Sequence, residues 1–491
     1  ATGSCVRAAP ATEKMLGVAV LLHLLAWSSA QKELLVYPSV VEERTTDTNL
    51  VLRVSDDITL NLEKSSVLAE RLLFATDAGS GYHLETIDTT SIRENIYHDV
   101  NRQSSVHVHH KNGALHIEGI INNKLRIKPL AEAERSSQGQ ILHSLYEVEE
   151  IKEDLEERAS SAHSSVLTTL TNSAKSFHHT GTSRPNNVSK FVVDLHVISD
   201  EEHQANFVNE EELITYLAVM TNAVNLRFLD MQAPSISFKL VGVTNSTNDT
   251  FESHIVGTIE ANETLYGLVK YYKEKNIPGD VVYLITNRNL ASISDNGTVR
   301  KNVAGLAFVG EVCTELGVAE GEDVARSYDG VHTMAHELAH SLGAWHDNGT
   351  GECSWSEGFL MSYEDGGPKK YRLSSCSQKQ IREVVQKRDD TCINEVGSAA
   401  HTVRPNILPG TRTTDWLYCN LILKKLRRIV FPKKPLEWSS KCKMLCCYDI
   451  RMSDRTKNTT CQIVDILDGM SCDIGRTCRR GVCRNHTELQ N

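Results

Sequence analysis

The stretch from residue 336 to residue 347 reads His336-Glu337-Leu338-Ala339-His340-Ser341-Leu342-Gly343-Ala344-Trp345-His346-Asp347, and its spacing decides the fold around it. On an α-helix, residues four apart share a face and lie about 6 Å apart along the axis. His336 and His340 are therefore expected to direct both imidazoles at one point. Gly343 adopts a left-handed conformation at no steric cost, so it can end the helix and turn the chain back. The turn at Gly343 would bring His346 to the same point. The sequence therefore predicts a metal site with three histidine ligands.

A catalytic zinc ion fits this ligand set, because three protein ligands leave a fourth position for water. Glu337 follows the first ligand and is expected to act on that water as a general base. A third histidine and a later methionine turn complete the metzincin signature. The alternative, a pair of surface histidines on an amphipathic helix, accounts for His336 and His340 but not for Gly343 and His346. The pattern therefore favours a hydrolytic zinc site.

The loop after the third histidine contains one apolar segment, Phe359-Leu360-Met361-Ser362-Tyr363, among glycine and serine residues. Met361 stands fifteen residues beyond His346. We expect it to form the methionine turn, with its side chain beneath the metal. Ordinary packing of a loop methionine is the alternative interpretation.

The chain has 491 residues, 40% of them hydrophobic and 23% charged, so a globular protein of about three folded units is expected. Residues 1–14 precede Met15 and are interpreted as an upstream extension. Residues 15–30 have the features of a secretion signal, with an apolar run from Leu16 to Trp27 and small residues before a cleavage point after Ala30. This run is too short for a stable membrane anchor. The product is therefore expected to be secreted, extracellular and without a membrane span.

The patterns of cysteines and of glycosylation sites agree with secretion. No cysteine lies between Cys5 and Cys313, four stand at 313, 353, 376 and 392, and eight crowd into 419–483. The twelve from Cys313 onward are an even number, which suits disulfide pairing outside the cell, whereas free thiols would suit a cytosolic protein. Eight sequons for N-glycosylation point the same way: Asn187, Asn245, Asn248, Asn262, Asn296, Asn348, Asn458 and Asn485.

Charge divides the chain. From Ser398 onward there are 17 Lys and Arg against 8 Asp and Glu, a net of +9, which leaves −20 for the other residues to give the total of −11. A basic tail behind an acidic body suggests anionic partners such as glycosaminoglycans or cell surfaces, and no nucleic-acid partner is expected. The densest basic cluster is Lys424-Lys425-Leu426-Arg427-Arg428. A merely solvated face is the alternative interpretation.

Three regions differ in residue pattern. Residues 31–187 show the alternation of β-strands, for example at 50–54 and 115–121, which predicts a β-rich N-terminal region. Its last part, 160–187, is rich in Ser, Thr and His and is interpreted as a linker that suits cleavage. Residues 188–397 alternate strands and helices, which predicts an α/β (α+β) domain with a mixed sheet and a zinc-binding helix. Residues 398–491 are expected to form a small, basic, disulfide-rich module.

Within residues 188–397 the expected elements can be placed from the apolar pattern. The expected strands are 191–198, 236–243, 280–286 and 305–310. The expected helices are 210–228, 264–275, 324–342, which carries the first two histidines, and 378–388.

Further residues carry a resemblance to a known family. The motif ends in His346-Asp347, residues 304–313 are similar to an edge strand above the cleft, and residues 371–377 are similar to the segment after the methionine turn. Together they make residues 188–397 resemble the reprolysins, a metzincin branch that includes snake-venom metalloproteases and their membrane-bound and matrix-acting relatives. Asp347 is the marker of this branch. In size, glycosylation sites and short basic tail, the chain is most similar to the secreted reprolysins of tick saliva.

The resemblance implies a site and a reaction. It implies a zinc endopeptidase that cleaves extracellular matrix or plasma proteins, such as gelatin or fibrinogen, with consequences for haemostasis. Glu337 is the implied general base, beside one Zn²⁺ held by His336, His340 and His346. The substrate is implied to bind along an edge strand made of Gly305, Leu306, Ala307 and Phe308. Two disulfides are also implied, Cys313–Cys392 and Cys353–Cys376. Some relatives bind Ca²⁺, but no ligand set in this sequence matches that site.

The means of latency and two other functions stay open. The resemblance implies that residues 31–187 are a prodomain, most clearly around 113–146. In many relatives a prodomain cysteine caps the zinc, but residues 31–187 contain no cysteine. Steric cover, another ligand such as a histidine of 107–110, or no latency at all are the alternatives. A binding protein that acts through the cysteine-rich tail is one other function, although it would not need Glu337 and three ligands. A cell-surface sheddase is the second, although it would need a membrane span.

Overall fold

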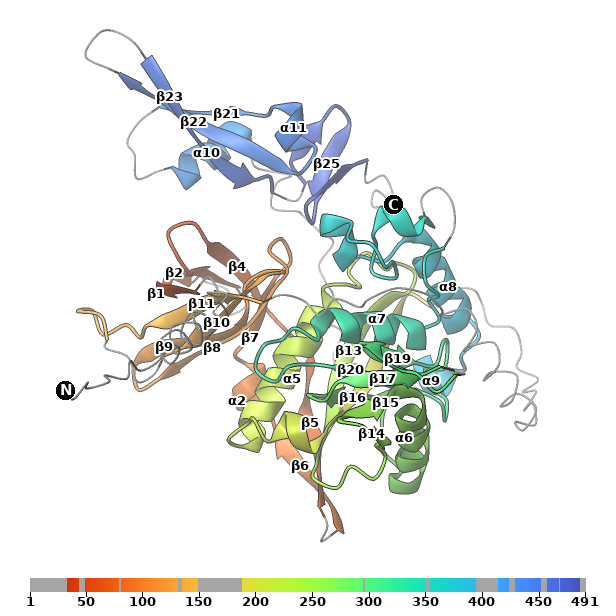
Figure 1. The fold of residues 1–491 in the computed structure, drawn as a ribbon. Coiled ribbons are helices and arrows are strands. Elements are labelled where there is room, and N and C mark those ends of the chain that lie inside the picture. Colours follow the sequence, from red (N-terminus) through yellow and green to blue (C-terminus); the bar gives the residue numbers. More distant parts are fainter. Residues whose placement is uncertain are drawn as a thin grey trace, which may run out of the picture.

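The computed structural model describes residues 33–43, 49–78, 81–130, 135–148, 188–294, 296–348, 353–393, 414–423, 429–451, 457–467 and 469–485. The expected extension and secretion signal (1–30), the linker (160–187) and the basic cluster (424–428) lie outside the described residues. Figure 1 shows an N-terminal sheet, a central domain in which helices pack on a sheet, and a C-terminal disulfide-rich module, which confirms the predicted fold class. Among the described helices, none is long and apolar enough to cross a membrane.

The N-terminal region is built on a nine-stranded antiparallel sheet in the order β1-β11-β10-β9-β8-β7-β4-β3-β2. Side chains on alternate residues, such as Leu60 and Leu62, point into a small separate core with Val106 and Ile117. The strands are β1 (Glu33–Val36), β2 (Ser39–Glu43), β3 (Asn49–Arg53), β4 (Thr59–Lys64), β7 (Ile96–Asp99), β8 (Ser104–Lys111), β9 (Ala114–Ile120), β10 (Leu125–Pro129) and β11 (His143–Glu147).

The histidines at 107 and 109 belong to this sheet. On β8, the rings of His107 and His109 stack 4.5 Å apart, and His109 stacks on His116 of β9 at 5.3 Å. Among the described residues, the histidines that converge on one point are others, those of the sequence motif at 336–346. His107 and His109 therefore stack within the N-terminal sheet and do not lie with the three histidines expected to bind zinc.

Acid should weaken the N-terminal sheet through His143. This ring is buried. It is neutral because its Nδ1–H donates to the carbonyl of Ile141 while its Nε2 accepts the N–H of Ile117. Burial lowers the pKa of His143 to about 4, below the value of about 6.5 in an unfolded chain. The unfolded state therefore binds the extra proton first, and this contribution to stability is lost as the pH falls from about 6.5 towards 4.

We expect His143→Gln to reduce the pH dependence of stability, because the amide oxygen can accept the N–H of Ile117 without titrating. Urea unfolding at pH 7.5 and at pH 4.5 measures this. The wild type should lose more stability between the two pH values than the variant does. An identical loss in both proteins would show that the protonation of His143 is not linked to unfolding.

The central domain has a seven-stranded mixed sheet in the order β19-β20-β16-β12-β13-β5-β6. Strands β12 (Lys190–Ser199), β13 (Ser235–Ser246), β16 (Val281–Thr286) and β20 (Val318–Glu322) run parallel, and β19 (Gly305–Ala307) pairs antiparallel with β20 at the edge. The other two strands, β5 (Leu68–Ala78) and β6 (Gly81–Asp88), come from the N-terminal region. The boundary expected at 187/188 therefore divides one sheet between two parts of the chain.

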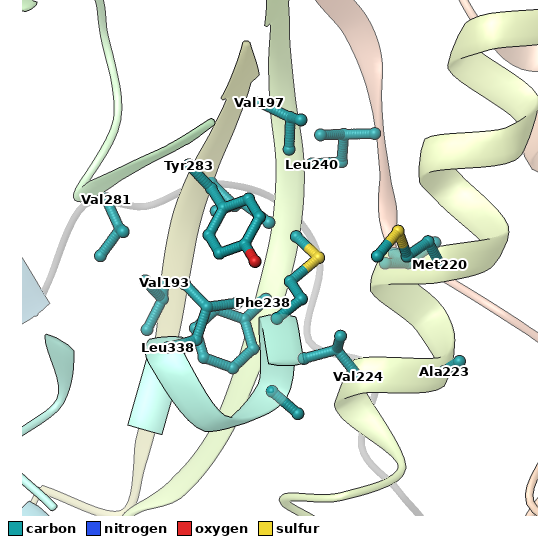
Figure 2. Close-up of a cluster of buried hydrophobic side chains, with 14 of the residues drawn as sticks. Val193, Val197, Met220, Ala223, Val224, Phe238, Leu240, Val281, Tyr283 and Leu338 are labelled. Atoms are coloured by element: carbon teal, nitrogen blue, oxygen red, sulfur yellow. The ribbon is translucent and has the colours of Figure 1, made fainter. Parts of the chain in front are cut away.

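Helices cover both faces of this sheet. Val197 of β12 belongs to the core beneath α5 (Glu210–Asn225) and α7 (Val331–Ser341), whereas its neighbour Ile198 packs on the other face with residues of α6 (Ala261–Lys275). Figure 2 shows the first core, where Val193, Phe238 and Tyr283 of the strands meet Met220 of α5 and Leu338 of α7.

A four-stranded sheet, β14-β15-β17-β18, adjoins the domain. The remaining elements are α2 (Thr90–Arg93), α4 (Glu201–Gln204), β14 (His254–Ile255), β15 (Thr258–Glu260), β17 (Leu290–Ile293), β18 (Val299–Val303), η2 (Trp355–Glu357), η3 (Gly367–Tyr371), α8 (Ser375–Val385) and α9 (Asp390–Ile393).

The helix expected at 324–342 begins later, at Val331. Arg326 and Tyr328 have φ values of 71° and 57°, in the left-handed region that a helix excludes. The carboxylate of Asp329 accepts the N–H of Val324 at 2.8 Å, which closes residues 324–329 into a loop. The prediction is therefore wrong for residues 324–330. The apolar pattern alone does not reveal such a local side-chain to backbone bond.

The C-terminal module is held by four disulfides, so that all twelve cysteines from Cys313 onward are paired. The four are Cys419–Cys446, Cys442–Cys478, Cys447–Cys461 and Cys472–Cys483. Its elements are α10 (Asp415–Ile422), β21 (Val430–Lys433), α11 (Leu436–Ser439), β22 (Lys443–Arg451), β23 (Lys457–Asp465), β24 (Ser471–Asp473), β25 (Arg476–Arg479) and β26 (Val482–Arg484).

Arg480 fixes this module to the central domain. Its side chain is 1% exposed and lies 3.0 Å from the carboxylate of Asp230, which also pairs with Arg372 at 2.5 Å. Arg480 also donates to the carbonyls of Leu226 and Tyr371. Although burial favours the neutral acid, Arg480 and Arg372 hold the pKa of Asp230 well below its usual range. A buried, fully charged contact of this kind sets one orientation of the module on the domain.

Candidate active site

The three histidines of the motif come together at one point. His336 and His340 lie on α7, and Gly343, with a φ of 108°, turns the chain after the helix. The Nε2 atom of His346 lies 3.0 Å from that of His336 and 3.1 Å from that of His340. A tetrahedral zinc ion with Zn–N bonds of about 2.0–2.1 Å needs nitrogens about 3.3 Å apart. The three histidines therefore suit zinc as a donor set, and the two distances from His346 are close to this value.

Hydrogen bonds to the opposite ring nitrogens fix the tautomers of the first two histidines. The Nδ1–H of His336 donates to the carbonyl of Leu360 at 2.9 Å, and the Nδ1–H of His340 donates to the carbonyl of Ala344 at 2.7 Å. Because a carbonyl only accepts, the proton must sit on Nδ1 in both rings. Each Nε2 therefore carries the lone pair of its ring and is the atom that can bind a metal ion.

Tyr363 supplies the corresponding partner of His346, a role that sequence reasoning missed. Its hydroxyl oxygen lies 2.6 Å from Nδ1 of His346, and the two ring centroids are 4.6 Å apart. Partners of this kind orient metal ligands and set their tautomer. The only sequence signal is the place of Tyr363 two residues after Met361, and that spacing does not show where the phenol points.

We expect Tyr363→Phe to weaken zinc binding by about 10- to 100-fold, because the Nδ1–H of His346 loses its acceptor. Competition with a coloured zinc chelator measures the affinity without reference to activity. Tyr266→Phe, on α6 and outside the histidine cluster, is the matched control and should keep the wild-type affinity. Equal zinc affinity in Tyr363→Phe and the wild type would contradict the role.

Glu337 is on α7 with the first two histidines, and its side chain lies beside Gly305 of the edge strand β19. Its side chain is buried, with 3% exposure. A β-carbon added at Gly305 would come within 2.7 Å of both the Cγ of Glu337 and the Cγ2 of Thr333. Any larger residue at position 305 would therefore displace the Glu337 side chain. The glycine leaves the room that this carboxylate needs.

The strand expected at 305–310 is shorter: three of the four expected edge residues form β19 (Gly305–Ala307), at one edge of the described sheet, and Phe308 follows its end. Substrate binding by these residues stays a prediction. The chain leaves the sheet after Ala307, and the N–H of Gly310 then donates to the carbonyl of His340 at 2.8 Å. Phe308 instead packs near the ring of Tyr266, at a centroid distance of 5.7 Å.

Met361 is fully buried in the same core as α7, and the segment around it is bonded to the motif on both sides. The carbonyl of Met361 accepts the N–H of Asp347 at 2.9 Å. The carbonyl of the preceding residue, Leu360, holds His336, and its N–H donates to the carbonyl of Arg372 at 2.8 Å. The segment thus braces His336 and Asp347, and the position of the Met361 side chain beneath the metal stays a prediction.

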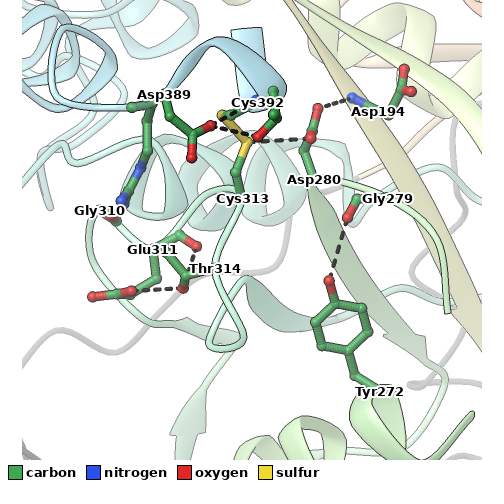
Figure 3. Close-up of a disulfide and its surroundings, with 12 residues drawn as sticks. Asp194, Tyr272, Gly279, Asp280, Gly310, Glu311, Cys313, Thr314, Asp389 and Cys392 are labelled. Atoms are coloured by element: carbon green, nitrogen blue, oxygen red, sulfur yellow. Dashed lines mark hydrogen bonds between the residues drawn. A yellow bond between two sulfur atoms is a disulfide. The ribbon is translucent and has the colours of Figure 1, made fainter. Parts of the chain in front are cut away.

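The structure contains both disulfides that the resemblance implies, Cys313–Cys392 and Cys353–Cys376. The first joins the segment after β19 to α9 (Figure 3). Beside it, Asp280 accepts the N–H of Asp194 at 2.8 Å, which connects this corner to β12. The edge strand is therefore anchored a few residues beyond its end.

Three carboxylates, those of Asp200, Asp249 and Glu252, meet away from the histidines. The guanidinium of Arg288 lies among them, with Nε 3.1 Å from Glu252 and 3.7 Å from Asp200. Burial, followed by the charges of Asp249 and Asp200, raises the pKa of Glu252 to about 9. A guanidinium and a retained proton thus already reduce the negative charge of this group. Calcium binding stays unassigned.

Comparison with known proteins agrees with this geometry. Residues 190–396 match the reprolysin (M12B) family zinc metalloprotease model. The venom metalloproteinase BumaMPs1 of Olivierus martensii is 28% identical over 376 residues, which cover 73% of this chain and 92% of that protein. The venom metalloproteinase antarease-like TtrivMP_A of Tityus trivittatus is 26% identical over 344 residues, which cover 65% and 84%. The solved metalloproteinase-II of Bacteroides fragilis covers 75% of this chain and 95% of that chain at 13% identity, with a TM-score of 0.33, too low to define a shared fold.

The family match and the venom relatives place the protein in the class of zinc metalloendopeptidases. More narrowly, residues 190–396 are a reprolysin-type metzincin domain, as the sequence resemblance predicts. The relatives named here come from Olivierus and Tityus, so the narrower likeness to tick salivary proteins stays a prediction.

Proposed function

We propose that this protein is a secreted endopeptidase that cleaves extracellular matrix or plasma proteins, with zinc held by His336, His340 and His346 and with Glu337 as general base. The observation that carries the proposal is the convergence of three histidines beside a buried Glu337, with Nε2 of His346 3.0 Å from that of His336 and 3.1 Å from that of His340. When bound, zinc lowers the pKa of a coordinated water towards about 7 and polarises the scissile carbonyl.

Residues of the chain carry the remaining steps. Glu337 takes the proton of the attacking water and passes it to the departing amine. The free edge of β19 binds the substrate as an added strand through backbone hydrogen bonds, which accepts many side chains and explains how whole proteins are bound. The carbonyls of Leu360 and Ala344 hold two of the imidazoles in place throughout the reaction.

Two further parts of the proposal concern location and partners. Secretion is supported by the signal expected at 15–30 and by the venom origin of the relatives. Binding of glycosaminoglycans or cell surfaces through the basic tail stays a prediction, because its densest cluster, residues 424–428, lies outside the described residues.

Cleavage of gelatin and fibrinogen by the processed protein, with and without a zinc chelator, tests the function. We expect both proteins to be cut and the chelator to abolish cutting. Absence of cleavage, together with effects on cells that persist in the chelator, would favour instead a binding protein that acts through its cysteine-rich tail.

A further inference from the structure

The helix α7 carries a third histidine on the side that faces the expected zinc ion. His332, His336 and His340 follow one another at intervals of four residues, so their side chains form one row along the helix. The ring centroid of His332 lies 6.5 Å from that of His336. His332 is therefore one helical turn away from the cluster that His336 and His340 form with His346.

The imidazole of His332 faces the segment that follows Met361. Its ring lies nearly edge-on to the ring of Tyr371, at the end of η3, with centroids 6.4 Å apart and an angle of 81° between the planes. The guanidinium of Arg227 lies over the same Tyr371 ring, 4.8 Å from its centroid. His332 is partly exposed, but its Nδ1 atom is buried and has no hydrogen-bond partner among the described residues. Because a buried polar atom without a partner is costly, this ring is suited to bind a polar group that enters beside it.

Positive charge gathers around this ring. Arg227 is 3% exposed and donates at 3.0 Å to the side-chain carbonyl of Gln103, which is a neutral acceptor. Burial lowers the pKa of His332 well below its usual value, and the charges of Lys370, His336 and Arg227 lower it further, in that order. Two cationic side chains, one from η3 and one from the end of α5, therefore act on the space beside His332.

The edge strand indicates which part of a substrate lies over His332. β19 begins at Gly305 beside Thr333 of α7, and the chain beyond it reaches His340, whose carbonyl accepts the N–H of Gly310. The strand therefore runs in the same direction as α7. A peptide that pairs antiparallel with β19, the more stable arrangement, runs the opposite way. The residue that follows the scissile bond then lies towards the start of α7, at His332.

The side chain of that residue has one wall to meet. Adjacent side chains of an extended peptide point to opposite sides, so one of the two residues at the scissile bond points towards α7. Across the cleft from β19, the segment 360–372 is fastened to α7 by the bond from His336 to the carbonyl of Leu360. A side chain that points to α7 just after the scissile bond therefore enters between His332 and Tyr371.

We propose that His332 determines the specificity for the residue that follows the scissile bond, and that the enzyme prefers an acidic side chain there. This inference rests on the proposed function and names the substrates of the same site. The carboxylate accepts the N–H of the His332 imidazole and is attracted by Lys370 and Arg227. An apolar side chain leaves the imidazole without a partner, and a lysine side chain is repelled by the two cations.

Four fluorogenic peptides, identical except for Glu, Gln, Leu or Lys after the scissile bond, test the inference. We expect kcat/KM for the Glu peptide to exceed that for the Leu and Lys peptides by about tenfold or more, the gain from one hydrogen bond to a charged group. Mass spectrometry of the products establishes that all four are cut at the same bond. Equal rates, or fastest cleavage of the Leu peptide, would overturn the inference and leave the proposed function standing. Failure of the zinc-loaded protein to cut any peptide would overturn both.

Variants of the same protein assign the preference to residues. His332→Leu replaces the imidazole by an apolar group and should reverse the order, so that the Leu peptide is cut faster than the Glu peptide. Lys370→Met, at a partly exposed position, removes only a charge and should lower the ratio of Glu to Gln cleavage; it keeps the test decisive if His332→Leu does not fold. Lys379→Met, on α8 with 76% of its side chain exposed, is the matched control and should keep the wild-type ratios. Wild-type ratios in His332→Leu and Lys370→Met would also overturn the inference.

Discussion

Glu337→Gln is expected to bind zinc as the wild type does and to lose peptide hydrolysis by about 10²- to 10⁴-fold in kcat/KM. Glutamine has nearly the same shape, so it fits the space left beside Gly305. Its amide cannot take the proton of the attacking water, so only the proton transfer is lost. Hydrolysis of a fluorogenic peptide, measured beside the zinc content of the same sample, separates the two effects.

Glu364→Gln is the control for this prediction, because Glu364 lies in an exposed stretch of the loop after Met361. It should keep the activity of the wild type within about twofold, as surface substitutions usually do. Wild-type hydrolysis by Glu337→Gln would mean that another group is the general base.

Phe74→Ala is expected to destabilise the protease domain, although Phe74 lies in the N-terminal region. The ring is completely buried against residues of β13 and α5. Replacing a buried phenylalanine by alanine removes its burial and leaves a cavity, which together cost about 3–5 kcal/mol of unfolding free energy. Urea unfolding followed by far-ultraviolet circular dichroism measures the change.

Leu84→Ala is the matched control on the same hairpin. Leu84 lies on β6 with 49% of its surface exposed, so the loss should stay within about 0.5 kcal/mol. If Phe74→Ala instead produced a separate early transition and left the main one unchanged, the N-terminal region and the protease would be independent folding units.

Much of the site could be predicted because its signals are local in sequence. The i, i+4 spacing of His336 and His340, and a glycine before His346, specify a helix and a turn with little help from the rest of the chain. The expected strands at 191–198 and 280–286 were also found nearly in place, as β12 and β16. Buried parallel strands are continuous apolar runs, and their lengths are easy to recognise.

Other features depend on which distant segments meet, and the sequence does not state this. The alternation of β5 identifies a strand but not its partner β13, more than 150 residues away. Asp230 and Arg480 are ordinary charged residues until the fold buries them together. Tyr363 became recognisable only from its distance to His346. The bond from Gly310 to His340 of α7, just beyond the edge strand, likewise joins segments that the sequence does not show to be neighbours.

The central claim is that three histidines hold one zinc ion whose chemistry depends on Glu337. Elemental analysis of zinc per chain, in the wild type and in Glu337→Gln purified side by side without added metal, tests it most directly when peptide hydrolysis is measured on the same samples. The account predicts one zinc per chain in both proteins and hydrolysis about 10²- to 10⁴-fold slower in Glu337→Gln. A wild-type protein that cleaves peptides without zinc, or a Glu337→Gln protein that cleaves them as fast, would contradict it.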